Sequence, residues 1–185
     1  MVEMYKLMGR LGAQMSYWAY IRCMCVENGW DFEHLPNAHF DEHKDLIRGM
    51  YGTDIPPMKQ GVVSICVRRG DYLTPGWPFV NLWDQGYYPP AMALFPYKRF
   101  LVFSDDLEWC KRNEFFRDCE FWENRSPVED LNNMAACEHN ITANSSFAWW
   151  AAWLNPNPQK KVVAPSRWVV NHPYEPPQDW IVIRV

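Results

Sequence analysis

From Gly61 to the end of the chain, short runs rich in β-branched residues alternate with segments of helical periodicity. This alternation is typical of βαβ units, which place parallel strands side by side with helices across their faces. The run Val62–Val67 contains no charged residue, as is usual for a strand covered on both faces. The pattern predicts an α/β fold with a Rossmann-like parallel sheet and flanking helices.

The same periodicities predict where the individual elements lie. Strands are expected at Val62–Val67, Arg99–Phe103, Glu120–Trp122, Ile141–Ala143, Lys161–Ala164 and Ile181–Val185. Helices are expected at Pro90–Phe95, Asp106–Asn113, Pro127–His139 and Ser145–Leu154. The tail Ser166–Asp179 is rich in proline and is predicted to be irregular.

The chain is predicted to divide into an N-terminal segment, residues 1–60, and a Rossmann-like domain, residues 61–185. Gly9–Gly12 predicts a turn, because its two glycines bracket a short polar-apolar pair. Helical spacing follows over Ala13–Asn28, and a second, shorter helix is expected over Asp41–Tyr51. The stretch Trp30–Gln60 is expected to be a lead-in and not a domain of its own.

Composition excludes several classes of protein. The formal net charge is −4 and no basic block is present, which argues against nucleic acid as a partner. The six cysteines form no Cys-x-x-Cys pair, so reduced thiols are expected and a metal site is not. No stretch approaches the roughly 18 apolar residues of a membrane helix, and the start lacks a signal-peptide pattern. We expect a cytoplasmic protein without a transmembrane segment.

Two adjacent arginines follow the first predicted strand. Ligands of open α/β sheets bind beyond the carboxyl ends of the strands, and guanidinium groups match phosphate oxygens in charge and geometry. Arg68 and Arg69 are therefore predicted to hold a diphosphate, although strand alternation points them to opposite faces. Arg68 is the stronger candidate. The alternative is that both arginines make structural ion pairs with Asp71 and Asp105.

Polar residues also follow the second and fourth predicted strands. Asp105 and Asp106 could accept hydrogen bonds from a guanine base, or Asp105 or Ser104 could cap the helix that begins at Asp106. A second group of residues lies at the start of the helix after the fourth strand, where free backbone N–H groups can bind an anion. Its members are Asn144, Ser145, Ser146 and Phe147. Ser145 or Ser146 could alternatively serve as the helix cap.

Taken together, these segments resemble the family 11 glycosyltransferases, the α-1,2-fucosyltransferases. The matching runs are GRLGAQM at Gly9–Met15, SICVRRGDYL at Ser64–Leu73, FLVFSDDLEWCK at Phe100–Lys111, HNITANSSFAWWAAWLNP at His139–Pro156 and VVAPSRW at Val162–Trp168. The resemblance implies the donor-binding C-terminal lobe of a GT-B glycosyltransferase with a much reduced N-terminal lobe. It also implies transfer of L-fucose from GDP-fucose to a hydroxyl of an acceptor sugar, with inversion, no cofactor and no required metal.

The resemblance also implies roles for individual residues. Arg68 and Arg69 would bind the GDP phosphates and Asp105 or Asp106 the guanine, while Asn144 and the helix start Ser145–Phe147 would line the pyrophosphate. Arg10, Gly12 and Gln14 would face the acceptor. Breaking the sugar–phosphate bond leaves negative charge on the β-phosphate, which arginines stabilise. Asp71 is the nearest carboxylate for a catalytic base, and its alternative role is to pair with Arg69 or fix the turn.

Three departures from the family pattern bear on activity. Ala13 stands where the family has asparagine, Cys66 stands where it has histidine, and only about 50 residues separate the glycine and arginine motifs. Two functions are therefore open: a galactoside α-1,2-fucosyltransferase, or a GDP or GDP-sugar binding module with impaired catalysis. The short N-terminal part also leaves open an acceptor site completed by a second subunit in a homo-oligomer.

Overall fold

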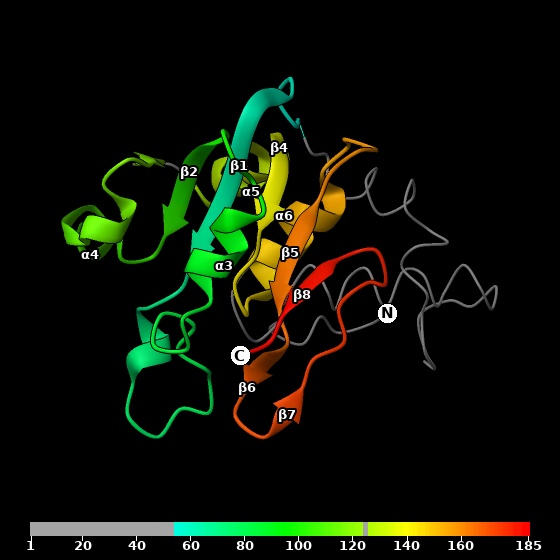
Figure 1. Cartoon of the computed structure of the whole chain (residues 1–185). Coiled ribbons are helices and arrows are strands. Elements are labelled where there is room, and N and C mark those ends of the chain that lie inside the picture. The colour runs from blue at the N-terminus through cyan, green and yellow to red at the C-terminus, as the bar shows by residue number, and fades with distance from the viewer. Residues whose placement is uncertain (1–53, 124–125) are drawn as a thin grey trace, which may run out of the picture. The chain divides into compact units, whose positions relative to one another are not determined.

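The computed structural model describes residues 54–123 and 126–185, and Ile55–Val185 forms one compact unit. Its centre is a parallel sheet in the order β3-β2-β1-β4-β5-β8 (Figure 1). The strands are β1 Lys59–Val67, β2 Arg99–Ser104, β3 Glu120–Phe121, β4 Cys137–Ile141, β5 Val162–Pro165 and β8 Ile181–Ile183. The predicted Rossmann-like α/β fold is confirmed.

The strand order contains one reversal. The chain runs outward from β1 through β2 to β3, then returns to the other side of β1 and continues through β4 and β5 to β8. Connections therefore leave the carboxyl ends of β1 and β4 in opposite directions, and the crevice that this opens is where such sheets bind ligands. The residues after β1 and after β4 are thereby brought to one place.

Helices cover both faces of the sheet. They are α3 Tyr88–Ala93, α4 Leu107–Arg112, α5 Pro127–Ala135 and α6 Ser146–Leu154. Figure 1 shows α3 on one face, and α5 and α6 packed side by side on the other. Because both faces are covered, Val62–Val67 is buried along its whole length, as predicted for this run. No helix among the described residues is long and apolar enough to cross a membrane.

Two tyrosines fasten the carboxyl edge of the sheet from the α3 side. The Tyr87 hydroxyl donates to the carbonyls of Thr142 at 2.8 Å and Val163 at 3.1 Å. The Tyr88 hydroxyl donates to the carbonyl of Cys66 at 3.2 Å. The two hydroxyls thus bond to carbonyls of β1 and β5 and to the one just after β4. Burial raises the pKa of both tyrosines, which keeps the hydroxyls protonated.

The largest errors in the predicted boundaries lie where α5 ends and β4 begins. The helix expected over Pro127–His139 ends at Ala135, and Cys137–His139 instead belongs to β4. The apolar spacing of α5 continues beyond Ala135, and the polar Asn140 breaks the alternation that would identify β4 as a strand. Periodicity alone therefore predicts a helix that is too long. The strand expected at Ile141–Ala143 is therefore β4, which runs from Cys137 to Ile141.

The tail predicted to be irregular contains a small hairpin. β6 Arg167–Val169 pairs antiparallel with β7 His172–Pro173, and Asn171 between them has a φ of 66°. Asparagine tolerates this left-handed conformation better than most residues, which suits it to the turn. Two short 3-10 helices, η2 Asp71–Leu73 and η3 Glu114–Phe116, complete the description.

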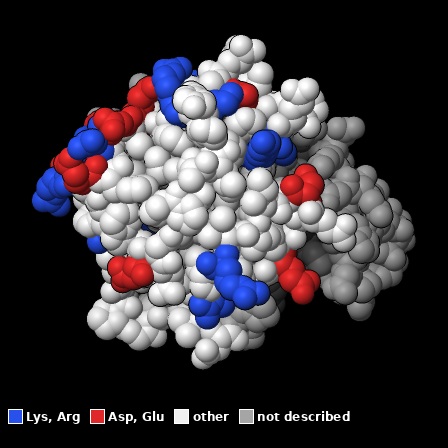
Figure 2. All heavy atoms as spheres, viewed as in Figure 1, with Lys and Arg blue, Asp and Glu red and all other residues white. Residues whose placement is uncertain are grey.

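Charged side chains on the outer surface pair with each other. In Figure 2 basic and acidic residues are interleaved along the upper left edge of the molecule, in the region that Figure 1 labels α4. Lys111 pairs with Glu108 and Glu123, and Arg117 pairs with Glu114. Mixed charges of this kind do not create the extended basic surface on which general nucleic-acid binding depends.

A buried amide network holds β1, β4 and the end of α6 together. Asn140 Nδ2 donates to Ser64 Oγ at 2.7 Å and to the Met134 carbonyl at 2.8 Å. Its Oδ1 accepts from Asn155 Nδ2, which also donates to the Cys137 carbonyl. Polar groups inside a sheet are costly unless each finds a partner, so this network defines the register of β4 against its neighbours.

Asn140→Ala should lower the free energy of unfolding by about 3 kcal/mol, because buried groups on Ser64 and Met134 lose their donor. Urea unfolding measures the change. The control is Asn133→Ala, whose half-exposed amide bonds only within α5, and which should stay within about 0.5 kcal/mol. A loss below about 1 kcal/mol for Asn140→Ala would show that the network contributes little.

Candidate functional site

Arg68 lies directly after β1 and is held by groups from three directions. Its Nη2 is 2.7 Å from Asp71 Oδ1, its Nη1 is 3.2 Å from Asp105 Oδ2, and its guanidinium carbon lies 4.9 Å from the centre of the Tyr72 ring. Burial is the largest single influence and would lower the pKa of Arg68, but Asp105 and the neighbouring Cys66, Tyr72 and Asp71 together raise that pKa above its ordinary value. The side chain is therefore charged and fixed in orientation.

One donor of Arg68 is left over. Its Nε is buried and has no hydrogen-bond partner among the described residues. A buried, charged N–H without an acceptor is costly and rare in folded proteins. Arg68 makes the ion pairs of the structural alternative with Asp71 and Asp105, whereas the Arg69 side chain pairs with Asp106. The pairs of Arg68 leave its Nε without an acceptor among the described residues.

Arg69 goes to the other side of the sheet, as strand alternation predicts. Its Nε is 3.2 Å from Asp106 Oδ2, and its guanidinium carbon lies 3.6 Å from the centre of the Trp109 ring on α4. Its backbone N–H donates to Asp105 Oδ1 at 2.9 Å. The structure thus separates the two guanidinium groups, and Arg69 braces α4 against the loop.

Gly70 permits the close approach of this loop to Asp105. A Cβ at position 70 would lie 2.6 Å from Asp105 Oδ2, closer than such atoms can come. Because Asp105 is also bonded to the backbone of Arg69, it cannot move aside without releasing the loop. Glycine at this position is therefore a packing requirement.

Both aspartates after β2 are engaged by the protein. Asp106 caps α4, since its Oδ1 accepts from the Trp109 N–H at 3.2 Å, and its own N–H donates to Ser104 Oγ at 2.9 Å. Asp105 instead holds the arginine loop. The alternative in which Asp105 or Ser104 caps this helix was wrong, because α4 begins at Leu107 and its cap is Asp106. A guanine-binding role for either remains a prediction, and it would require sharing these bonds.

The segment after β4 ties several loops together. Asn144 is buried, and its Nδ2 donates to the carbonyls of Val80 and Trp168, both at 2.9 Å. Its own carbonyl accepts from the Tyr72 hydroxyl at 2.7 Å. Ser145 is the N-cap residue of α6, but its side chain makes no capping hydrogen bond, so the alternative of a serine side-chain cap is not observed. The first-turn N–H groups of α6 are therefore not occupied by this side chain.

A pocket of about 130 Å³ opens at the carboxyl ends of β1 and β2, on the face covered by α5 and α6. Arg68, Asp105 and Phe147 from the predicted set line it, together with Asp130 and Met134 of α5. Burial raises the pKa of Asp130. Sequence reasoning missed Asp130 and Met134, although their i,i+4 spacing places them on one helix face.

Cys66 lines the same pocket and is buried. Burial raises the pKa of its thiol to about 12, so it stays protonated at neutral pH and is a weak donor. The other cysteines of the described part, Cys110, Cys119 and Cys137, are free thiols as well. Within residues 54–123 and 126–185, no group of acidic, histidine or cysteine side chains is arranged to hold a metal ion.

Three predicted acceptor-facing residues, Arg10, Gly12 and Gln14, lie outside the described residues. Ser146, at the first position of α6, is half-buried. The structure brings together Arg68, Asp71, Asp105 and the Asn144 loop. The side chains of Arg69 and Asp106 instead contact each other and α4.

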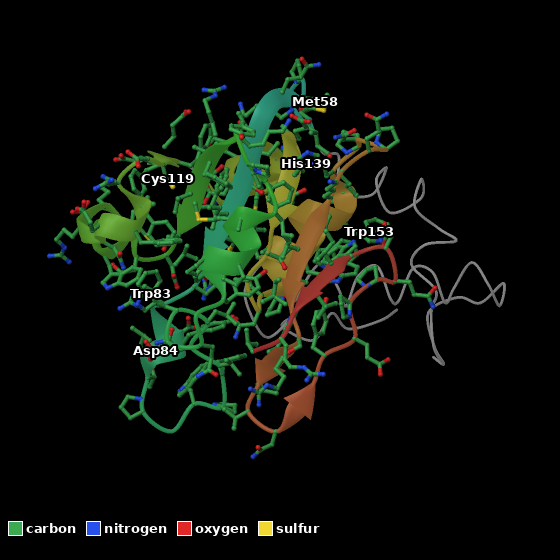
Figure 3. The ribbon with its side chains drawn as sticks, in the orientation of Figure 1. Met58, Trp83, Asp84, Cys119, His139 and Trp153 are labelled. Atoms are coloured by element: carbon green, nitrogen blue, oxygen red, sulfur yellow. The ribbon has the colours of Figure 1, made fainter. Side chains whose placement is uncertain are left out.

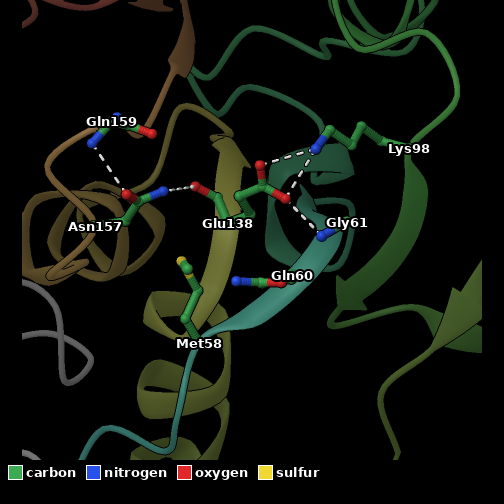
Figure 4. Close-up of a pocket in the computed structure, with 7 residues that line it drawn as sticks. All are labelled: Met58, Gln60, Gly61, Lys98, Glu138, Asn157 and Gln159. Atoms are coloured by element: carbon green, nitrogen blue, oxygen red, sulfur yellow. Dashed lines mark hydrogen bonds and ion pairs between the residues drawn. The ribbon is translucent and has the colours of Figure 1, made fainter.

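A second cavity lies at the amino ends of the strands, away from these residues (Figure 4). It has a volume of about 370 Å³ and centres on Glu138, which accepts from Lys98 at 2.8 and 2.9 Å and from the Gly61 N–H at 2.5 Å. These bonds lower the pKa of Glu138. Figure 3 shows Met58 and His139 at this end, and Trp83 and Asp84 towards the opposite one. No predicted site residue lines this cavity.

Tyr72→Phe should lower the free energy of unfolding by about 1.5 kcal/mol, because the buried carbonyl of Asn144 loses its donor while the ring stays in place. Burial raises the pKa of Tyr72 to about 12, so the hydroxyl is a donor across the physiological pH range. Thermal and urea unfolding measure the loss. Tyr97→Phe, at a fully exposed tyrosine, is the matched control and should be neutral. Equal stability of the two variants would contradict the role given to this bond.

Comparison with known proteins agrees with the arrangement of these motifs. The pattern of glycosyl transferase family 11 matches residues 34–176. The chain is 31% identical to the alpha-1,2-colitosyltransferase of Escherichia coli, over 78% of this chain and 59% of that protein. It is 35% identical to the O-antigen biosynthesis glycosyltransferase WbnK of Escherichia coli, over 77% of this chain and 56% of that protein.

A galactoside 2-alpha-L-fucosyltransferase of Bos taurus, SEC1, is 29% identical over 73% of this chain and 42% of its own length. The chain thus spans little more than half the length of the two bacterial relatives. Since the family pattern covers most of the chain, including every segment that meets at the carboxyl edge of the sheet, the chain belongs to glycosyl transferase family 11.

Proposed function

We propose that this chain binds the diphosphate of a GDP-sugar at the carboxyl ends of β1 and β4, as the donor site of an α-1,2-fucosyltransferase. The observation that carries the proposal is the buried Nε of Arg68, a charged donor without a partner among the described residues. A phosphate oxygen is the acceptor that suits it best, since guanidinium and phosphate match in charge and geometry. The start of α6 offers further N–H donors on the other side of the crevice.

The donor is GDP-fucose in this proposal, and the reaction is transfer to a sugar hydroxyl with inversion. The names of several relatives support this choice, because they are fucosyltransferases that act on galactosides. A related deoxysugar is the competing donor, since another relative is named a colitosyltransferase. The pocket beside Cys66, Asp130 and Phe147 would take part of the nucleoside, and the loop of Arg68 the phosphates.

The chemistry follows from the charge that develops at the phosphate. The bond between C1 of fucose and the β-phosphate oxygen breaks, and its electron pair stays on that oxygen. The acceptor oxygen forms the new bond at C1 from the opposite face, and its proton passes to a base. Arg68 stabilises the leaving diphosphate, because its guanidinium is already oriented by Asp105 and Tyr72.

Asp71 is our candidate for the base. Its side chain keeps 28% of its surface exposed, and its Oδ1 is 2.7 Å from Arg68 Nη2, which places it beside the leaving group. The second candidate function is GDP-sugar binding without transfer. Ala13 favours it, because alanine lacks the hydrogen-bonding side chain that the family has in its glycine motif.

Arg68→Ala should weaken GDP binding by about 10- to 100-fold, the loss of one charge-assisted contact of about 1.5–3 kcal/mol. Isothermal titration calorimetry with GDP measures the affinity. Arg117→Ala is the control, since this arginine is largely exposed and pairs only with surface carboxylates. Unchanged affinity in Arg68→Ala would remove the site from this edge of the sheet.

Transfer is tested separately from binding. Incubation with GDP-fucose and lactose should release GDP and yield a fucosylated product detectable by mass spectrometry, and Asp71→Asn should reduce the rate by about 100-fold or more if Asp71 is the base. Asp84→Asn, at an exposed carboxylate, should leave the rate unchanged. GDP binding without any turnover, at high protein concentration and with several galactosides, would favour the binding module.

A further inference from the structure

Trp77 is exposed in a loop whose conformation is well fixed. It keeps 49% of its surface accessible, and two other apolar residues, Leu73 in η2 and Val170 in the β6–β7 turn, keep 42% and 52%. The loop is held by the Val170 N–H, which donates to the Pro78 carbonyl at 2.7 Å, and by an antiparallel bridge between Phe79 and Val169. We call Leu73, Trp77 and Val170 the Trp77 rim.

A series of ring contacts links the rim to Arg68. The Trp77 and Phe79 rings lie 5.7 Å apart between centroids, and Phe79 stacks on Tyr72 at 4.3 Å with an interplanar angle of 17°. The Tyr72 ring in turn lies under the Arg68 guanidinium at 4.9 Å. Each member is therefore positioned by the next, and Trp77 is anchored to the arginine that we assign to the diphosphate.

The loop is anchored from the other side of the crevice as well. Asn144 donates to the carbonyl of Val80 at the end of the loop and to that of Trp168 in β6. The residue that precedes α6 thus sets the position of both segments that carry the rim. An exposed indole on a loop bonded in this way is ordered before any ligand arrives, which reduces the entropy lost on binding.

We propose that Trp77 is a stacking platform for the acceptor saccharide, a proposal that rests on the donor function above. If Arg68 holds the diphosphate, the acceptor hydroxyl must reach the adjacent sugar carbon, and the rest of the acceptor extends over the surface next to the arginine loop. Trp77 lies in the loop that follows the arginine loop, and it is connected to Arg68 through the Phe79 and Tyr72 rings. An indole face combines a large apolar area with a polar N–H, which suits a sugar ring with C–H groups on one face and hydroxyls at its edge.

Trp77→Ala should raise the KM for lactose about tenfold, with kcat at saturating lactose and GDP affinity unchanged, because the donor site is untouched. Trp77→Tyr should restore most of the affinity, whereas Trp77→Leu should resemble Trp77→Ala. Tyr97→Ala, at a fully exposed aromatic residue elsewhere, should have no effect. Saturation-transfer NMR on the GDP-loaded chain with lactose gives a readout that does not require turnover.

The outcomes separate this proposal from the donor site. No GDP binding by the unmodified chain would overturn the donor function itself. GDP binding that depends on Arg68, together with equal saturation transfer to lactose in the unmodified chain and Trp77→Ala, or with none in either, would overturn the platform alone. Full activity of Trp77→Leu would exclude stacking. A shift from dimer to monomer in Trp77→Ala by sedimentation would make the rim a contact between copies of this chain, and would also overturn the proposal.

Discussion

The carboxylate of Asp105 is the contact on which the arrangement of the crevice depends. One oxygen accepts from the backbone of Arg69 and the other pairs with the guanidinium of Arg68, so the end of β2 is tied to the loop that follows β1. Gly70 lets that loop approach to a distance no other residue would allow. A single side chain thereby orients one arginine and fixes the backbone of the next.

On the other side of the crevice, after β4, Asn144 plays a role similar to that of Asp105. Its amide and carbonyl connect the start of α6 to Tyr72, to Val80 and to β6. Because Tyr72 also lies under Arg68, the two walls meet at one aromatic ring. Preorganisation of this kind matters for a site that stabilises charge, since donors that are already oriented lose little free energy when the charge appears.

Much of this organisation could be predicted from the chain alone. Apolar β-branched runs indicated the parallel sheet, and the polar residues after each run indicated where a ligand would bind. The failures are informative. Apolar spacing predicts a helix as far as His139 because it does not report the buried bonds of Asn140, whereas α5 ends at Ala135. The proline-rich tail gives no signal for the two short strands of the β6–β7 hairpin. In both cases the missing information was long-range pairing.

Local sequence patterns specify the fold class, the position of the arginines at a strand end and their alternation across the sheet, because these follow from residue type and a two-residue period. They do not specify which partners each arginine meets. Only the packed structure brings Asp105 to Arg68, Trp109 to Arg69 and Trp77 into line with Tyr72 and Phe79. These contacts depend on the order of the strands and on loops that are distant in sequence. Their side chains meet only after folding, so no local periodicity in the sequence predicts them.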